Sequence, residues 1–144
     1  MTTPQSLSIT VANDLQEVPQ VAERIETFCS NLNVSKKTTY RFNVALEEAL
    51  TNIISYGFSV GGRHQIDIGV EFHDGELIAT VSDDGKPFDP LSQTPPDIHA
   101  KIEDRRVGGL GIHLLRTLME KVEYRRDGGT NRLTFRTRVD AAGG

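Results

Sequence analysis

Glu48 and Asn52 are the residues whose types and spacing most clearly allow chemistry, and both fall in the segment RFNVALEEALTNIISY, residues 41–56. Four apolar residues follow the spacing of an amphipathic helix and share one inward face: Phe42, Leu46, Ala49 and Ile53. Glu48 and Asn52 lie one turn apart on the edge of that face, whereas Glu47 points away. Glu48 could take or orient a proton, and Asn52 could give a neutral oxygen to a hard cation such as Mg2+. Alone the pair is ambiguous, because Glu and Asn also occupy solvated helix edges.

Asp83 is the second candidate. The segments 64–73 and 76–83 have the pattern of two strands joined at Asp74-Gly75, a dipeptide typical of tight hairpin turns. In the second strand, alternation predicts one shared face for Leu77, Ala79, Val81 and Asp83. The apolar face therefore ends in a carboxylate, which must find a donor or stay wet because burying it unpaired is costly.

A long connection follows. Residues 85–109 have no apolar period and contain Pro87, Pro90, Pro95 and Pro96. A segment of this length inside a compact domain is usually functional or disordered, and we expect a lid over about 86–108. The glycines of the run 108–111, GGLG, then open a predicted helix and leave backbone N–H groups free to meet phosphate.

The remaining elements complete an α+β pattern. We expect a strand at a sheet edge over 5–11, a helix from the Asn13-Asp14 cap to Asn33, and a second helix from Ser35 to near Gly57. A final hairpin should join 122–126 to 132–139 across 127–129, DGG. The order predicts two layers, with a mainly antiparallel mixed sheet covered on one face by three helices.

Composition sets limits on the class of protein. With 144 residues, 37% hydrophobic and 25% charged, the sequence suits one soluble domain over 1–144. The net charge of −4 argues against nucleic acid as a partner, and no apolar run approaches the ~20 residues of a membrane span. The first ten residues lack the features of a secretory signal, so we expect a cytoplasmic protein. Cys29, the single cysteine, is interpreted as a small helix residue near the core.

Three segments together support a family resemblance: EALTN (48–52), DDGKPF (83–88) and GGLG (108–111). In order and spacing they resemble the N, G1 and G2 boxes of the GHKL ATPase superfamily, whose Bergerat fold binds ATP under a lid. The likeness covers about 35–136, and it is strongest to the anti-sigma-factor serine kinases, because the boxes read EEALTNIISYGF, DDGKPFDP and GGLGIHLL.

The resemblance implies roles for individual residues. Asn52 would ligate the Mg2+ that bridges the ATP phosphates, Glu48 would polarise the attacking hydroxyl or water, and Asp83 would accept a hydrogen bond from the adenine amino group. Gly85 would let the backbone pass close to the base. The further nucleotide contacts that we expect are Pro87, Phe88, Gly108, Gly109, Leu110 and Gly111, with Asn131 of the final hairpin, or Thr130 in its place. Arg106, with Lys101 and Arg105, could reach the γ-phosphate or remain a solvated lid charge.

At the level of function, the resemblance implies an ATP-dependent serine/threonine protein kinase that acts as an anti-sigma factor. In such partner switching the kinase phosphorylates a STAS-type antagonist, holds a sigma factor and usually forms a homodimer. The alternative is a regulatory module that binds ATP without kinase activity. The catalytic domain of a histidine kinase is less favoured, because no dimerisation helices with a phosphoacceptor histidine precede these motifs.

Overall fold

The computed structural model describes residues 5–57, 62–85 and 115–139. A 3-10 turn, Leu15–Glu17, comes before the first α-helix, and residues 115–118 are also helical. The larger elements are β1 (Gln5–Ala12), α1 (Val18–Asn31), α2 (Lys36–Tyr56), β2 (Gln65–His73), β3 (Glu76–Asp83), β4 (Lys121–Asp127) and β5 (Thr130–Arg138). The predicted lid and the glycine run 108–111 lie outside the described residues.

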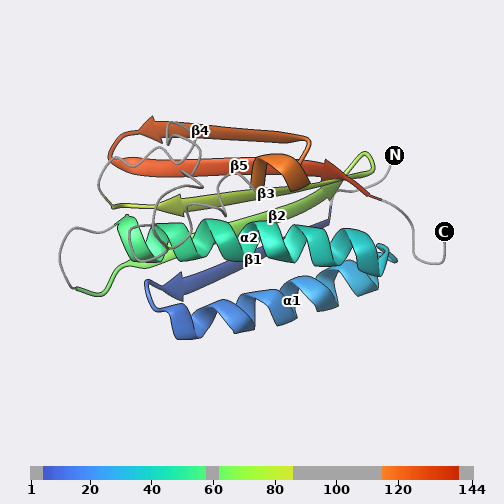
Figure 1. Cartoon of the computed structure of the whole chain (residues 1–144), viewed down its shortest axis with the longest axis horizontal. Coiled ribbons are helices and arrows are strands. Elements are labelled where there is room, and N and C mark those ends of the chain that lie inside the picture. The colour runs from blue at the N-terminus through green and yellow to red at the C-terminus, as the bar shows by residue number, and fades with distance from the viewer. Residues whose placement is uncertain (1–4, 58–61, 86–114, 140–144) are drawn as a thin grey trace, which may run out of the picture.

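The strands form one five-stranded sheet in the order β1-β2-β3-β5-β4 (Figure 1). Each of its four pairings is antiparallel. Within the described residues the sheet is therefore antiparallel throughout, where the sequence suggested a mainly antiparallel mixed sheet. As predicted, β1 lies at an edge of the sheet, because it is the first strand in this order.

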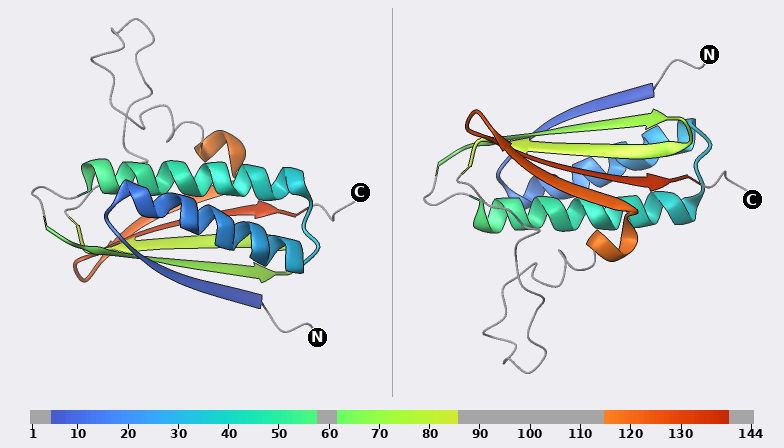
Figure 2. Two further views of the ribbon diagram at one scale, coloured as in Figure 1. Left: turned by 90° about the horizontal axis from the view of Figure 1, so that it is seen from below. Right: turned by 90° about the horizontal axis from the view of Figure 1, so that it is seen from above.

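The helices α1 and α2 lie side by side on one face of the sheet, and the helical residues 115–118 lie on the same side (Figure 2). The α+β, two-layer architecture predicted from the element order is thus confirmed. The core lies between the layers, where Phe42 of α2 meets Phe135 of β5 with ring centroids 5.6 Å apart. Both rings are fully buried.

Local sequence explains where the helices begin. Ser35 caps α2, since its side chain accepts a hydrogen bond from the Thr38 N–H. Pro19 falls in the first turn of α1, where no N–H is required. Cys29 lies on the inward face of α1 and is fully buried in the core. Burial raises the pKa of the Cys29 thiol, partly offset by a hydrogen bond with Thr39, as befits a structural rather than a reactive cysteine.

The second hairpin turns more tightly than the sequence suggested. Its turn consists of Gly128 and Gly129 alone, with φ of 56° and 82°, and β4 continues through Asp127. Two successive positive φ values match the right-handed twist of the strands, and glycine adopts them without steric cost. The two-residue turn pairs Asp127 with Thr130 and Arg126 with Asn131.

Candidate functional site

Three polar residues form a row across neighbouring strands. Asp83 of β3 pairs with Asn131 of β5, and Asn131 pairs with Arg126 of β4. The side chains of Asp83 and Asn131 are buried, with 6% and 4% of their surface exposed. As predicted, Leu77, Ala79 and Val81 share the inward face that ends at Asp83.

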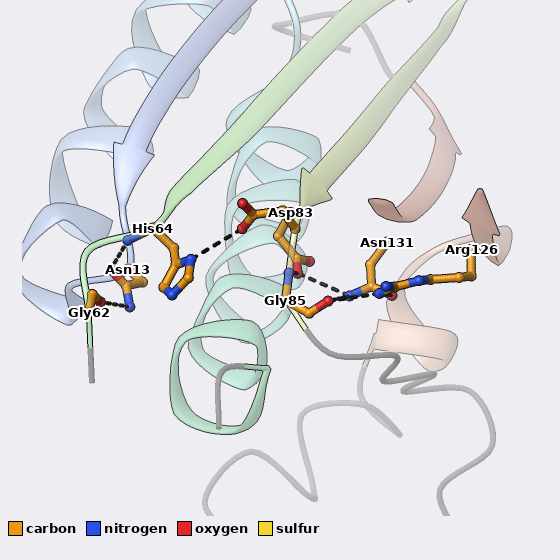
Figure 3. Close-up of polar contacts among 8 residues, drawn as sticks. Asn13, Gly62, His64, Asp83, Gly85, Arg126 and Asn131 are labelled. Carbon is orange, nitrogen blue, oxygen red and sulfur yellow. Dashed lines mark hydrogen bonds and ion pairs between the residues drawn. The ribbon is translucent and has the colours of Figure 1, made fainter. Parts of the chain in front are cut away.

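The Asp83 carboxylate is held by one of its two oxygens. Asp83 Oδ1 accepts hydrogen bonds from the Gly85 backbone N–H at 2.8 Å and from Asn131 Nδ2 at 3.0 Å (Figure 3). Within residues 5–57, 62–85 and 115–139, no donor lies within hydrogen-bonding distance of Oδ2. A carboxylate oxygen accepts hydrogen bonds, so Oδ2, which these two donors leave unoccupied, is suited to accept one from a ligand.

Gly85 lies against the end of α2. A side-chain carbon on Gly85 would sit 2.3 Å from the Gly57 carbonyl oxygen and 2.9 Å from Asp83 Oδ1. The absence of a side chain at Gly85 therefore lets β3 and α2 meet directly beside Asp83. The passage of this backbone close to a base, which the resemblance implies, stays a prediction.

The helix that ends at Gly57 carries the other two candidates. Asn52 is buried, and its Nδ2 donates a 2.8 Å hydrogen bond to the Glu48 carbonyl one turn earlier. This bond fixes the carboxamide and leaves Oδ1 as the atom for a ligand. Asn52 precedes Gly57 by five residues, which is about 7.5 Å along the helix axis. A molecule that contacts Asp83 could therefore extend along α2 towards Asn52.

Glu48 has an environment suited to proton transfer. Its side chain is half-buried on α2, beside the exposed Glu47. Burial, and to a smaller extent the Glu47 charge, raises the pKa of the Glu48 carboxyl above its ordinary value. A carboxylate whose pKa moves towards neutrality is a stronger base than an exposed glutamate.

Comparison with known proteins identifies the family. The model of the histidine kinase-like ATPase domain matches residues 11–137. The chain belongs to the histidine kinase-like ATPase family. It is 30% identical to the serine-protein kinase RsbW of Halalkalibacterium halodurans over 132 residues, which cover 88% of this chain and 79% of the relative. It is 29% identical to the serine/threonine-protein kinase BtrW of Bordetella bronchiseptica, covering 70% and 71% of the two chains.

A solved structure supports the same fold. The RsbU and RsbW domains of Rv1364c from Mycobacterium tuberculosis match with a TM-score of 0.67 and 15% identity, over 94% of this chain and 32% of that one. The family match and the kinase relatives confirm the predicted membership of the histidine kinase-like ATPase family and the predicted likeness to the anti-sigma-factor serine kinases.

Several predicted contacts of this histidine kinase-like ATPase lie outside the described residues: Pro87, Phe88, Arg106, Gly108, Gly109, Leu110 and Gly111. Of the two alternatives on the final hairpin, Asn131 lies beside Asp83. Thr130 precedes Asn131 in β5, so its side chain points to the opposite face of the sheet, and it pairs with Asp127 of β4. The described part of the chain has no group of three or more His, Cys, Asp or Glu side chains arranged to hold a metal, and no described helix has the length and apolarity needed to cross a bilayer.

Sequence reasoning missed two residues that contact the candidate site, Tyr124 and Arg126. Arg126 Nη1 donates to the Gly85 carbonyl at 2.7 Å and to Asn131 Oδ1 at 3.1 Å (Figure 3). The Tyr124 hydroxyl donates to the same Asn131 Oδ1. The Gly128-Gly129 turn was the available signal, since a two-residue turn pairs Arg126 with Asn131.

A further set of contacts ties the ends of β2 and β3 together. His64 Nδ1 lies 3.3 Å from Asp84 Oδ1, and the His64 backbone N–H donates to Asn13 Oδ1 at 2.9 Å (Figure 3). Asn13 Nδ2 in turn donates to the Gly62 carbonyl at 3.1 Å. These contacts connect residues that lie next to Asp83 in the candidate site.

Proposed function

We propose that this protein is an ATP-dependent serine/threonine protein kinase that acts in the cytoplasm as an anti-sigma factor. In partner switching it phosphorylates a STAS-type antagonist and otherwise holds a sigma factor. The similarity to proteins named serine-protein kinase RsbW supports this proposal. So does the match of the histidine kinase-like ATPase family to residues 11–137.

The arrangement of this chain's own residues also supports the proposal. Glu48 and Asn52 lie one turn apart on α2, and the end of α2 meets Gly85 beside Asp83. A proton acceptor, a neutral oxygen ligand and a buried hydrogen-bond acceptor thus come from two adjoining elements. This set matches what a phosphoryl-transfer site for a purine nucleotide needs.

In the proposed complex, Asp83 Oδ2 accepts a hydrogen bond from the adenine amino group, and the phosphates extend along α2. Asn52 fits a magnesium ion, because its amide nitrogen is occupied by the Glu48 carbonyl and its oxygen is the remaining donor atom. Mg2+ prefers oxygen ligands and commonly combines a few protein ligands with substrate phosphates. When bound there, it would neutralise charge on the phosphate oxygens during transfer.

Glu48 is the proposed catalytic base. As the serine oxygen of the antagonist bonds to the γ-phosphorus, the bond from that phosphorus to the β–γ bridging oxygen breaks and ADP leaves. The serine proton passes to Glu48. The raised pKa of Glu48 favours this transfer, because it makes the carboxylate more basic.

The direct test incubates the protein with Mg2+, γ-labelled ATP and a STAS-domain protein that carries an acceptor serine. We expect label on that serine, and none when the serine is replaced by alanine or Glu48 by glutamine. ATP binding without any transfer would refute the kinase and favour the alternative, a regulatory module that binds ATP.

We also propose a homodimer in which β1 and α1 take part. β1 is an edge strand, and Leu15, in the turn between β1 and α1, is an apolar residue with 51% of its surface exposed. Burial of such a side chain between two copies would be favourable. Sedimentation should show a dimer that Leu15→Glu weakens; a wild-type monomer at micromolar concentration would refute this proposal.

A further inference from the structure

The Asn131 carboxamide uses all of its hydrogen-bonding capacity within the protein. Nδ2 donates to Asp83 Oδ1 at 3.0 Å and approaches the Gly85 carbonyl at 3.4 Å. Oδ1 accepts from the Tyr124 hydroxyl and from Arg126 Nη1. A primary amide offers two donors and two acceptor positions, so these four contacts saturate it. Asn131 could contact a nucleotide directly only by giving up one of them.

The partners of Asn131 also fix which way its amide points. A tyrosine hydroxyl can rotate to donate, but a guanidinium can only donate, so the atom beside Arg126 must be the amide oxygen. The nitrogen therefore faces Asp83. Since Arg126, Asn131 and Asp83 occupy paired positions on β4, β5 and β3, the sheet register maintains this order.

Arg126 holds the same carboxylate by a second route. Its Nη1 donates to the Gly85 carbonyl at 2.7 Å, and the Gly85 N–H donates to Asp83 Oδ1 at 2.8 Å. Both donors to Oδ1 are thus fixed in position by Arg126. With Oδ1 occupied twice, the carboxylate cannot rotate freely, and Oδ2 is directed to the other side.

We propose that Tyr124 and Arg126 are positioning residues that determine base specificity: through Asn131 and Gly85 they hold Asp83 so that Oδ2 meets an amino group on the purine. The inference rests on the proposed nucleotide-binding function. A base with an amino group at this position donates to Oδ2. A base with a keto oxygen there would set two acceptors against each other and leave Oδ2 without a donor, which is unfavourable.

ATP and inosine triphosphate make a suitable pair of probes, because they share ribose and triphosphate and differ at the purine 6-position. The measured quantity is the ratio of their dissociation constants, obtained by calorimetry on the full chain. In Tyr124→Phe and in Arg126→Met we expect the preference for ATP to fall by about fivefold or more, while inosine triphosphate affinity stays within about twofold.

Matched controls are available on exposed positions. Arg125→Met changes the neighbouring arginine, which is exposed, as Arg126 is, but pairs with Arg132 rather than with Asn131. Tyr40→Phe removes a hydroxyl from a tyrosine with 72% of its surface exposed. Both controls should keep the wild-type ratio. Thermal unfolding of each variant checks that it is folded, and Tyr124→Phe keeps the ring and changes no charge.

The outcomes separate the inference from the function on which it rests. If Asp83→Asn abolishes the ATP preference but Tyr124→Phe and Arg126→Met leave it unchanged, the positioning role is wrong and the adenine site stands. Equal losses of affinity for both nucleotides in these two variants would also overturn the inference, because they indicate a merely structural role. An unchanged ratio in Asp83→Asn would overturn the adenine site itself.

Discussion

Gly85 approaches Gly57 so closely that a side-chain carbon on Gly85 would lie 2.3 Å from the Gly57 carbonyl oxygen. The same carbon would lie 2.9 Å from Asp83 Oδ1. Neither neighbour moves aside easily, since one is backbone at the end of α2 and the other is a carboxylate held by two hydrogen bonds. The contact joins the strand that carries Asp83 to the helix that carries Glu48 and Asn52. The position of Gly85 therefore sets the distance between the two halves of the proposed site.

We predict that Gly85→Ala destabilises the protein by about 1–3 kcal/mol, because the methyl group must displace backbone in a packed region. For a chain of this size the melting temperature should fall by about 2–4 °C per kcal/mol, as measured by differential scanning calorimetry. ATP affinity should fall as well, since β3 and α2 move apart.

Gly69→Ala is the matched control for this prediction. Gly69 lies in β2, and a side-chain carbon there would meet nothing within 4 Å. The control should be neutral or slightly stabilising. Equal melting temperatures for Gly85→Ala and Gly69→Ala would show that the contact with Gly57 does not constrain the structure.

Asp83→Asn should weaken ATP binding about 10-fold to 100-fold, because the buried acceptor for the adenine amine loses its charge and the amide can present a donor instead. Isothermal titration measures the change. Asp84→Asn is the control, since Asp84 is the adjacent carboxylate but has 69% of its side chain exposed and contacts His64. Similar affinities in the two variants would remove Asp83 from the nucleotide site.

The sequence predicted the parts of the site that depend on local periodicity. The helical spacing placed Glu48 and Asn52 on one edge of α2, and strand alternation placed Asp83 at the end of a buried face, where it is 6% exposed. Both inferences need only the geometry of a single element. The capped start of α2 at Ser35 was predictable for the same reason.

The remaining parts depend on contacts between distant segments. Arg126 reaches Gly85 because β5 pairs with β3 on one side and with β4 on the other, and because the turn at Gly128-Gly129 has two residues rather than three. A shift by one residue would turn each side chain to the opposite face. The approach of Gly85 to Gly57 likewise depends on how α2 lies on the sheet, which periodicity does not specify.

Asn52→Ala should remove the dependence of ATP affinity on Mg2+, because Oδ1 is the atom that the Glu48 carbonyl leaves available for a cation. Titrations with and without excess chelator measure this dependence in wild type and variant. Asn43→Ala serves as a control on the same helix, since Asn43 donates to the Ala22 carbonyl of α1. An Mg2+ effect of wild-type size in Asn52→Ala would exclude Asn52 as a ligand.

Glu48→Gln should retain ATP affinity within about twofold and lose phosphoryl transfer by about 100-fold to 10,000-fold, because the amide cannot accept the serine proton.

The base works when ionised, so the single-turnover rate of the wild type should rise with pH through the raised pKa of Glu48. Burial is the larger cause of that raised pKa and the Glu47 charge the smaller one. Glu47→Gln removes the smaller cause, so the pKa of Glu48 should fall, though not to its ordinary value. The acid limb of the rate profile should then shift to lower pH. Rates measured across a pH series at saturating ATP and antagonist test both variants. If the acid limb of Glu47→Gln coincides with that of the wild type, and Glu48→Gln still transfers phosphate appreciably, the proton must pass to another group.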